Sequence, residues 1–297
     1  MAIAHKFEYV KPSKLEEALE VLSKFGAEAS VLAGGTDFAV RLKEHNNAPK
    51  MLVDIKGINE LKTLKLENGT LKIGALVTFS ELIASEIIKQ NFPLIHEAST
   101  TVASIGTRNR ATIVGNICSA VPSLDSGPAL LVYEADVLLK SKSGERKVSI
   151  KDWFTGPKRT AIAVGEIVVG LELKLPSEKN GTSYIKLGRY RGEDLAQAGI
   201  GVMVTDKKQY KIAFCAVGPV PVRAKIIEDL LNGKEIDDKI IAEAKLLVDK
   251  VISPITDIRS SKEYRMHIAK VMLERGLLKA KERITGVYHE KHDILGG

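Results

Sequence analysis

The sequence contains few of the residues that carry nucleophilic or metal chemistry. Its 297 residues include only two cysteines, Cys118 and Cys215, and six histidines. Two thiols cannot supply the four ligands of a typical iron–sulfur cluster, and neither cysteine belongs to a CxxC pair. The histidines form no HxH or HExxH pattern, and no serine stands in a GxSxG turn. We therefore predict no metal site and no catalytic side chain, which argues against a zinc enzyme or a serine hydrolase.

Long apolar runs and aromatic side chains are also scarce. The best apolar run, residues 161–173, is interrupted by two glutamates and falls short of the ~18 residues that a membrane span requires. The N-terminal residues lack the uncharged apolar core of a signal peptide. Aromatic residues make up 5% of the chain, and the net charge of +7 comes from 44 basic against 37 acidic residues without a basic stripe. We expect a cytoplasmic protein with no membrane span and no nucleic-acid partner.

The rest of the composition is that of a globular protein. Hydrophobic residues make up 44% of the chain, and its length predicts about two domains. The sequence PSEKNG at residues 176–181 is the clearest break in the pattern, so we place a domain boundary between residues 177 and 178. Helix and strand patterns occur on both sides of this break, which predicts an α+β protein.

Hydrophobic periodicity predicts the individual elements. In the last predicted helix, we expect Tyr264, Ile268, Met272 and Leu273 to form the buried stripe. Residues 199–204 begin like a dinucleotide fingerprint, but we discard that interpretation because a turn and a strand follow instead of a helix. We predict helices over residues 14–25, 79–89, 222–231, 236–252 and 261–284, and strands over 30–33, 51–55, 71–76, 137–139, 147–150, 166–175, 183–187, 198–204 and 210–217.

Two glycine-bearing loops remain as candidates for ligand binding. In the first, residues 31–37 (VLAGGTD), a strand runs into two glycines, whose backbone can adopt positive φ and present N–H groups to anionic oxygens. The second, residues 108–125, places Thr112, Asn116 and Ser119 around Gly115 and ends in an aspartate. Together the two loops suggest a cradle for a diphosphate and a carboxylate for ribose hydroxyls. Taken alone, each loop is more typical of an ordinary tight turn than of a ligand site.

Several segments in order resemble the FAD-binding (medium) subunit of the molybdenum hydroxylases. That family includes xanthine dehydrogenase, carbon monoxide dehydrogenase and archaeal aldehyde or glyceraldehyde oxidoreductases. The resemblance implies a two-part FAD-binding domain of the vanillyl-alcohol-oxidase (PCMH) type over residues 1–177, with subdomains of about 1–57 and 58–177, and a smaller α+β flavoprotein domain over 178–297. It rests on AGGTD at 33–37, RNRATIVGN at 108–116, SAVPSLD at 119–125, YIKLGRYRGEDLAQAG at 184–199, AVGPVPVRA at 216–224 and SSKEYRMHIAKVMLERGL at 260–277.

The resemblance also implies roles for single residues. The first glycine loop would wrap the pyrophosphate of FAD, the second would complete the wrap, Asp125 would accept hydrogen bonds from the ribose, and Val168 and Lys186 would lie against the flavin. The family usually has two glycines before the asparagine, whereas here Val114 takes the first position. The expected FAD-binding residues are Val31, Leu32, Ala33, Gly34, Gly35, Thr36, Asp37, Ile105, Gly106, Thr112, Gly115, Asn116, Ser119, Asp125, Val168 and Lys186.

The implied function is electron transfer. FAD in this chain would take electrons from the [2Fe–2S] cluster of a small subunit and pass them to an external acceptor. An aldehyde, carbon monoxide or an N-heterocycle would be oxidised at molybdopterin in a large subunit, within a heterotrimer or a dimer of heterotrimers. Lys186 is the candidate cation for stabilising the reduced flavin. We further expect Gly34→Val to remove FAD with little effect on the fold, because a β-branched side chain at a positive-φ turn would block the phosphate.

Two alternative functions remain open. One is a stand-alone FAD-dependent oxidoreductase on the same fold, although the lack of an evident acid–base pair argues against it. The other is a binding module that has lost the cofactor, although the retention of both glycine loops and of Asp125 argues against it.

Overall fold

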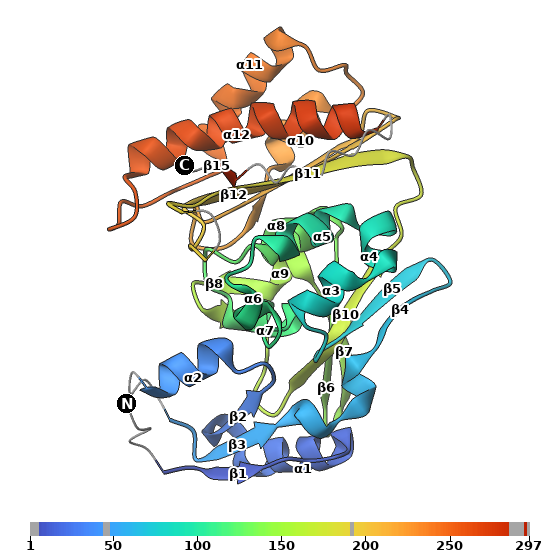
Figure 1. Cartoon of the computed structure of the whole chain (residues 1–297), viewed down its shortest axis with the longest axis vertical. Helices are drawn as coiled ribbons and strands as arrows, with labels where there is room; N and C mark the ends of the chain where they lie inside the picture. The colour runs from blue at the N-terminus through green and yellow to red at the C-terminus, as the bar shows by residue number, and fades with distance from the viewer. Residues whose placement is uncertain (1–5, 44–47, 191–192, 285–293, 296–297) are drawn as a thin grey trace.

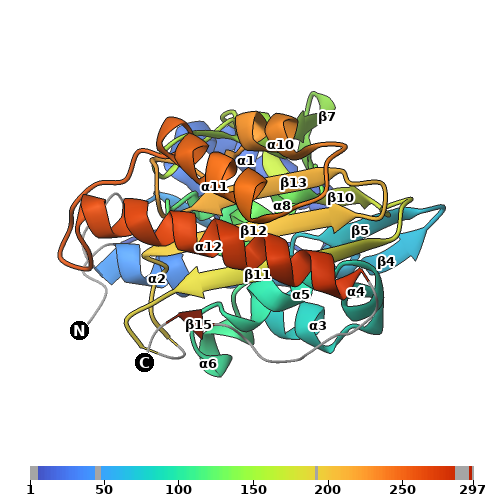
Figure 2. The same ribbon diagram turned by 90° about the horizontal axis from the view of Figure 1, so that it is seen from above.

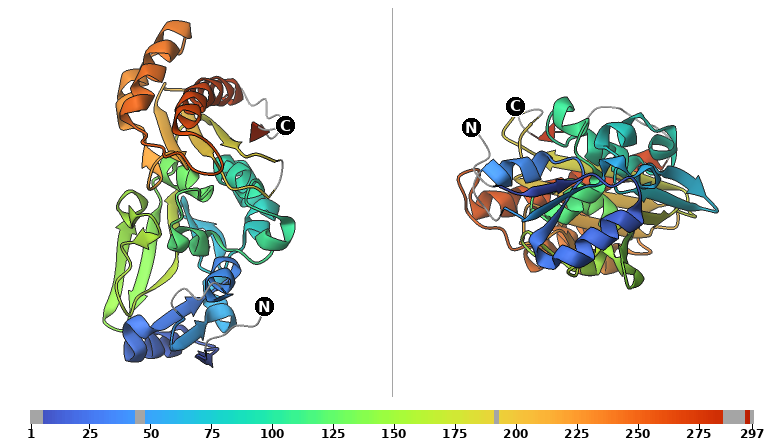
Figure 3. Two further views of the ribbon diagram at one scale, coloured as in Figure 1. Left: turned by 90° about the vertical axis from the view of Figure 1, so that its left-hand side faces the viewer. Right: turned by 90° about the horizontal axis from the view of Figure 1, so that it is seen from below.

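The structure of the chain is a computed structural model that describes residues 6–43, 48–190, 193–284 and 294–295. The described elements form three layers along the long axis of the molecule, each built on its own sheet (Figure 1). The layer that begins the chain and the layer that carries the last long helix lie at opposite ends (Figure 3). None of the helices in the described ranges combines the length and apolarity needed to cross a membrane.

The first layer is a small parallel sheet covered by a helix. Its strands, in the order β1 (Glu8–Val10), β3 (Met51–Asp54) and β2 (Ala29–Leu32), pack against α1 (Leu15–Phe25), and α2 (Thr36–Lys43) follows β2. The start of α1 is fixed by the Glu17 carboxylate, which accepts the backbone N–H groups of Ser13 and Lys14. The helix and both strands predicted in this region are therefore confirmed, with bounds that differ by one residue.

The middle layer combines an antiparallel sheet with several short helices. Ser85 divides the predicted helix over 79–89 into two, because its side chain accepts the N–H of Ile88 and starts a new helix. The sheet has the order β4 (Leu64–Glu67), β5 (Thr70–Gly74), β10 (Ile167–Lys174), β6 (Asp136–Ser141), β7 (Gly144–Ser149). The other elements are α3 (Phe79–Ala84), α4 (Glu86–Asn91), α5 (Pro93–Thr100), α6 (Ile105–Arg108), α7 (Ile113–Ser119), α8 (Ser126–Val132), α9 (Ile150–Trp153) and the hairpin of β8 (Phe154–Gly156) and β9 (Arg159–Thr160).

The third layer is a second five-stranded sheet under a long helix. Figure 2 shows α12 (Lys262–Arg283) lying across β11 (Asn180–Leu187) and β12 (Ala198–Thr205). Every residue of β12 is buried, and its place in a strand confirms that residues 199–204 are no dinucleotide fingerprint. The remaining elements are β13 (Tyr210–Cys215), β14 (Val222–Arg223), α10 (Lys225–Leu231), α11 (Asp238–Leu247) and β15 (Ile294–Leu295), which pairs in parallel with β11.

Two sequence expectations for this layer need correction. The segment predicted as a helix over 222–231 begins as strand β14, and the helix starts only at Lys225. The buried face of α12 is also rotated from the predicted stripe: Tyr264 is 48% exposed, whereas Arg265 is buried. Arg265 can take an inward position because its guanidinium finds a backbone carbonyl and a carboxylate there. Met272 and Leu273 are buried as expected.

The middle and third layers meet through helices. Helices α5 and α8 pack against the underside of the third sheet, as Figure 1 shows. The predicted boundary between residues 177 and 178 falls in the connection between β10 and β11 and stays a prediction. The helices α5 and α8 bring polar residues of the middle layer next to β11, and this contact forms one end of the site described below.

Candidate functional site

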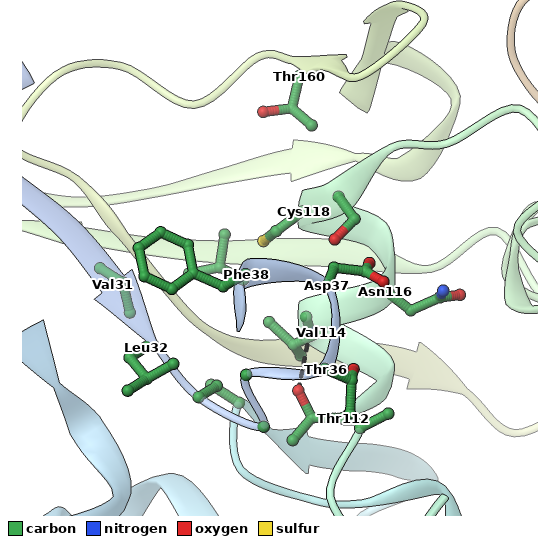
Figure 4. Close-up of a pocket in the computed structure, with 18 of the residues that line it drawn as sticks. Val31, Leu32, Thr36, Asp37, Phe38, Thr112, Val114, Asn116, Cys118 and Thr160 are labelled. Atoms are coloured by element: carbon green, nitrogen blue, oxygen red, sulfur yellow. Dashed lines mark hydrogen bonds between the residues drawn. The ribbon is translucent and has the colours of Figure 1, made fainter. Parts of the chain in front are cut away.

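A cavity of about 510 Å³ is lined by residues from all three layers. This volume lies within the ~300–1,000 Å³ typical of cofactor pockets. Four segments build most of its wall: β2 with the loop into α2, the helix α7 with the loop after it, the segment over residues 160–168, and β11 at Lys186. Figure 4 shows the part of the wall where the first two segments lie beside each other.

Adjacent glycines connect β2 to α2, and each is required for a different reason. Gly35 has a φ of +80°, a conformation that favours glycine. Gly34 does not have positive φ; instead, a Cβ at this position would lie 2.1 Å from the backbone oxygen of Arg110. The sequence-based expectation for Gly34→Val therefore rested on the wrong backbone conformation. A side chain at position 34 would separate this loop from residues 110–111, so the substitution would destabilise the fold as well as the site.

The second glycine segment is a helix rather than the expected loop. Thr112 precedes α7, and its Oγ1 accepts the backbone N–H of Gly115 at 2.9 Å. A Cβ on Gly115 would lie 2.9 Å from the same Oγ1, so the glycine gives the cap room. Val114 is helical and only 4% exposed, a conformation that an L-residue adopts without strain. Replacing the family's usual first glycine therefore leaves this backbone intact.

The two glycine segments line one cavity, as the sequence suggested they should. Residues 31–37 and Thr112, Gly115, Asn116 and Ser119 all contribute to its wall. Gly34 and Gly35 carry no side chain in this wall, and the N–H groups at the N-terminus of α2, which follows them, attract anionic oxygens. This part of the cavity is suited to a phosphate-containing ligand.

A buried polar cluster forms the wall nearest the third sheet. The Lys186 ammonium donates to Asp125 Oδ2 at 2.9 Å and to the backbone oxygen of Thr101 at 2.8 Å. The Tyr184 hydroxyl donates to the other oxygen of Asp125 at 2.7 Å. Burial raises the pKa of Asp125, while Lys186 and Tyr184 oppose that shift. Each carboxylate oxygen has further acceptor capacity, so Asp125 can still accept a ligand hydroxyl.

Sequence reasoning missed Tyr184 and Thr101 in this cluster. The signal for Tyr184 was present, since residues two apart on a strand share one face and Lys186 was already a candidate. Thr101 contributes only its backbone oxygen, which side-chain patterns do not reveal.

The segment over residues 160–168 was also missed, apart from Val168. Ile162 and Val164 are 40% and 72% exposed although both line the cavity, so apolar surface is available to a ligand there. The segment is fixed by Glu166, which accepts two hydrogen bonds from Arg146 and one from the N–H of Ala163. This wall is suited to the ring of a nucleotide rather than to its phosphates.

The structure does not bring every predicted residue to the cavity. Ile105 and Gly106 lie on α6 outside its lining, and Ile105 is 69% exposed. Their neighbours Val102, Ala103 and Thr107 line the cavity instead. The short helix α6 turns Ile105 outward, a geometry that a motif match cannot supply. All the other predicted FAD-binding residues line the cavity.

The described residues offer little redox or metal chemistry of their own. They contain no cluster of three or more histidine, cysteine or acidic side chains that could hold a metal ion. Cys118 is exposed at the cavity wall. The two glycine segments, with a carboxylate and a cation in the wall nearest the third sheet, fit FAD, which would supply the redox chemistry at this site.

Comparison with known proteins agrees with this geometry. Residues 5–177 match the family described as the FAD binding domain in molybdopterin dehydrogenase, and residues 183–280 match the CO dehydrogenase flavoprotein C-terminal domain. The chain is 32% identical to the glyceraldehyde dehydrogenase medium chain of Sulfolobus acidocaldarius, over 90% of this chain and 95% of that one. It is 30% identical to the caffeine dehydrogenase subunit beta of Pseudomonas sp. (strain CBB1), over 94% of this chain and 96% of that one.

A solved structure shares the whole arrangement. Carbon monoxide dehydrogenase from Hydrogenophaga pseudoflava contains a chain that is 31% identical, with a TM-score of 0.91 over 95% of this chain and 99% of its own. Two family matches in sequence, similarity along nearly the entire length and a cavity built for a phosphate-containing cofactor lead to one conclusion. The chain belongs to the family of FAD-binding medium subunits of the molybdenum hydroxylases.

Proposed function

We propose that this chain binds FAD in the described cavity and transfers electrons within a molybdenum hydroxylase complex. Electrons would arrive from a [2Fe–2S] cluster in a small partner subunit and leave to an external acceptor. The substrate, an aldehyde, carbon monoxide or an N-heterocycle, would be oxidised at molybdopterin in a large partner subunit. A heterotrimer or a dimer of heterotrimers would hold the three chains. The observation that carries the proposal is the convergence of both glycine segments and the Asp125–Lys186 pair on one cavity.

Different residues of the cavity would bind different parts of FAD. The backbone at Gly35 and the start of α2 would hold the pyrophosphate, with Thr112, Gly115, Asn116 and Ser119 completing the contact from α7. Asp125 would accept hydroxyl hydrogen bonds, and Val168 and Lys186 would face the flavin. Bound FAD would supply the exchange between one-electron and two-electron carriers, and the protein would bind, orient and tune it.

The cation at Lys186 has a defined electrostatic role in this scheme. The Lys186 side chain is 4% exposed, and its ammonium is held by Asp125 and by the backbone oxygen of Thr101, so it cannot reorient freely. A fixed positive charge beside the flavin would favour the reduced form, which carries more negative charge. Because its partner Asp125 is also fixed, the two charges act together as one oriented dipole.

A stand-alone flavin oxidoreductase is less well supported. Such an enzyme needs an acid or base free to exchange protons with a substrate. Among the described acidic residues of the cavity wall, Asp125 is paired with Lys186 and Glu166 with Arg146, whereas Asp37 and Glu193 are exposed to solvent. These pairs favour cofactor binding over substrate proton transfer.

We also propose that the chain works in the cytoplasm. Its two cysteines, Cys118 and Cys215, are both free thiols. Free thiols are typical of a reducing compartment.

The function can be tested with a matched pair of glycine variants in the native complex. Gly35→Val should lower the affinity for FAD at least tenfold, because a β-branched residue cannot adopt the φ of +80° beside the phosphate. Gly69→Val is the control, since Gly69 has a similar φ of +70° in the β4–β5 turn with open space around its Cβ position. Flavin absorption per complex measures the outcome. Full FAD content in both variants would contradict the assignment of the cavity.

A further inference from the structure

Tyr184 is buried behind the cavity rather than in its wall. It lies on β11 two residues before Lys186, and 5% of its surface is exposed. Its hydroxyl donates to Asp125 Oδ1, while Lys186 donates to Asp125 Oδ2. One carboxylate is therefore held from two sides by two residues of the same strand.

The surroundings of Tyr184 fix its ring in place. A Cβ at Gly199, on the adjacent strand β12, would lie 3.0 Å from the Tyr184 hydroxyl and 2.6 Å from Cys215 Sγ. The glycine therefore leaves the space that the hydroxyl and the thiol occupy, with the two atoms 3.8 Å apart. The backbone N–H of Tyr184 donates to the Glu97 carboxylate at 2.7 Å, and this hydrogen bond anchors β11 at Tyr184. The hydroxyl has little freedom to leave Asp125.

This arrangement affects the charge that faces the cavity. Asp125 and Lys186 are 7% and 4% exposed, so water screens them weakly. A hydrogen bond from Tyr184 takes up part of the negative charge of Asp125. Without it, the carboxylate would offset the Lys186 ammonium more completely, and the positive field at the cavity would weaken.

We propose that Tyr184 is a positioning residue for the flavin site, which acts through Asp125 to set the position and the effective charge of Lys186. The inference rests on the proposed function, because it requires FAD to bind in this cavity. It predicts that Tyr184 affects the redox balance of the flavin without contacting it.

The test is the midpoint potential of FAD in the native complex, measured by spectroelectrochemistry. Tyr184→Phe should lower the ratio of affinities for reduced and oxidised flavin about tenfold, which is about 30 mV for a two-electron couple. In an Asp125→Asn background the same change should have no further effect, because the residue through which Tyr184 acts has lost its charge. Tyr210→Phe is the control, since Tyr210 is buried on β13 and donates to the Lys234 oxygen away from the cavity.

The outcomes separate the inference from the function on which it rests. An unchanged or raised potential in Tyr184→Phe, or an equal fall in both backgrounds, would overturn the inference and leave FAD binding intact. A wild-type complex without flavin would overturn both. If Tyr184→Phe fails to assemble, Gly199→Ala displaces the hydroxyl while keeping the ring. It should lower the potential in the same direction, and an unchanged potential in that variant would overturn the inference.

Discussion

Gly34 shows how one residue can hold two segments of the chain together. The space that its Cβ would need is taken by the backbone of Arg110 and Ala111, at 2.1–3.0 Å. Backbone atoms cannot rotate away as a side chain can, so the two segments approach closely only because residue 34 is glycine. These are the two segments assigned to the pyrophosphate.

We expect Gly34→Ala to reduce both stability and FAD binding. Separating the loop from residues 110–111 resembles overpacking, which costs about 1–3 kcal/mol, and it would also move the start of α2 relative to α7. Thermal unfolding of the chain and flavin content of the complex measure the two effects. Gly106→Ala serves as the control, because its nearest neighbour would be Ser104 Oγ at 3.8 Å and it lies outside the cavity. Equal behaviour of the two variants would refute this account of Gly34.

At the residue scale, side-chain chemistry was predictable and backbone contacts were not. Lys186 and Asp125 were assigned to one site from the family resemblance, and the structure places them 2.9 Å apart. The collision at Gly34 and the carbonyl of Thr101 depend on how distant backbone segments meet, which no local pattern encodes. Ile105 was expected at the site from the family resemblance, yet α6 directs it away from the cavity.

The loop before α12 is an element whose stability depends on one carboxylate. Asp257 accepts hydrogen bonds from the backbone of Arg259 and from the guanidinium groups of Arg259 and Arg265. Arg265 is 4% exposed and also donates to the backbone oxygen of Ala216 at the end of β13. Burial alone would raise the pKa of Asp257, but these hydrogen bonds outweigh it and lower the pKa to about 2.

This shift predicts an acid-sensitive contribution to stability. The folded pKa of about 2 lies below the unfolded value of 3.8, so the stabilisation is present above pH 3.8 and disappears as the pH falls toward 2. The full shift corresponds to about 2 kcal/mol, which solvent around this partly exposed group reduces to roughly 1 kcal/mol. Asp257→Asn should therefore lower the free energy of unfolding at pH 7 by about that amount.

Urea unfolding at pH 7 and at pH 2.5 tests this expectation. The difference between wild type and Asp257→Asn should shrink at the lower pH. Asp249→Asn is the control, because Asp249 pairs with Lys270 at the surface and such pairs contribute less than about 1 kcal/mol. A difference for Asp257→Asn that stays constant with pH would refute the linkage.

At the element scale, regular periodicity was reliable and capping decided the exceptions. Residues 14–25 show an apolar period of 3.6, and residues 198–204 form an apolar run. The predicted helix and the predicted strand are both present in the structure. The region over 108–125 was predicted to be a glycine-bearing loop, yet the Thr112 side chain caps the helix α7 within it. In 79–89, Ser85 similarly turned one predicted helix into two.

Across the whole molecule, a second buried ion pair besides Asp125–Lys186 joins the middle layer to the third. Glu97 on α5 contacts the Arg283 guanidinium at the end of α12, and Arg283 also donates to the backbone oxygen of Thr182. Burial raises the pKa of Glu97, while Arg283 opposes the shift. Both residues are less than one tenth exposed, so removing either partner leaves a buried charge uncompensated.

We expect Glu97→Gln to lower the free energy of unfolding by about 3 kcal/mol, in line with the loss of one partner from a buried pair. The double variant Glu97→Gln/Arg283→Met should recover part of the loss, because no charge is then left buried. Denaturant unfolding of wild type, of both single variants and of the double variant measures this difference. Glu86→Gln is the control, since Glu86 pairs with Lys89 in solvent and should change little. A double variant less stable than the sum of its parts would contradict the pairing.

The general arrangement of the molecule was accessible from the sequence through its family resemblance. An α+β fold with an FAD-binding part and a flavoprotein C-terminal part agrees with the matched families and with the similar structure. The contacts between the layers could not be predicted from the sequence, because pairs such as Glu97–Arg283 join residues far apart in the chain. Contacts of such long sequence separation leave no periodic signal in either segment.

The cavity wall draws on all three layers, from the loop after β2 to Lys186 on β11. A nucleotide held there would bind fully only while every layer is folded, so the free energy of binding would be shared by the entire chain. Local opening of any single layer would then also release the ligand, so the free energy of opening would include the free energy of binding. Cofactor loading would in this way increase the cooperativity of unfolding, making three stacked layers behave as one thermodynamic unit.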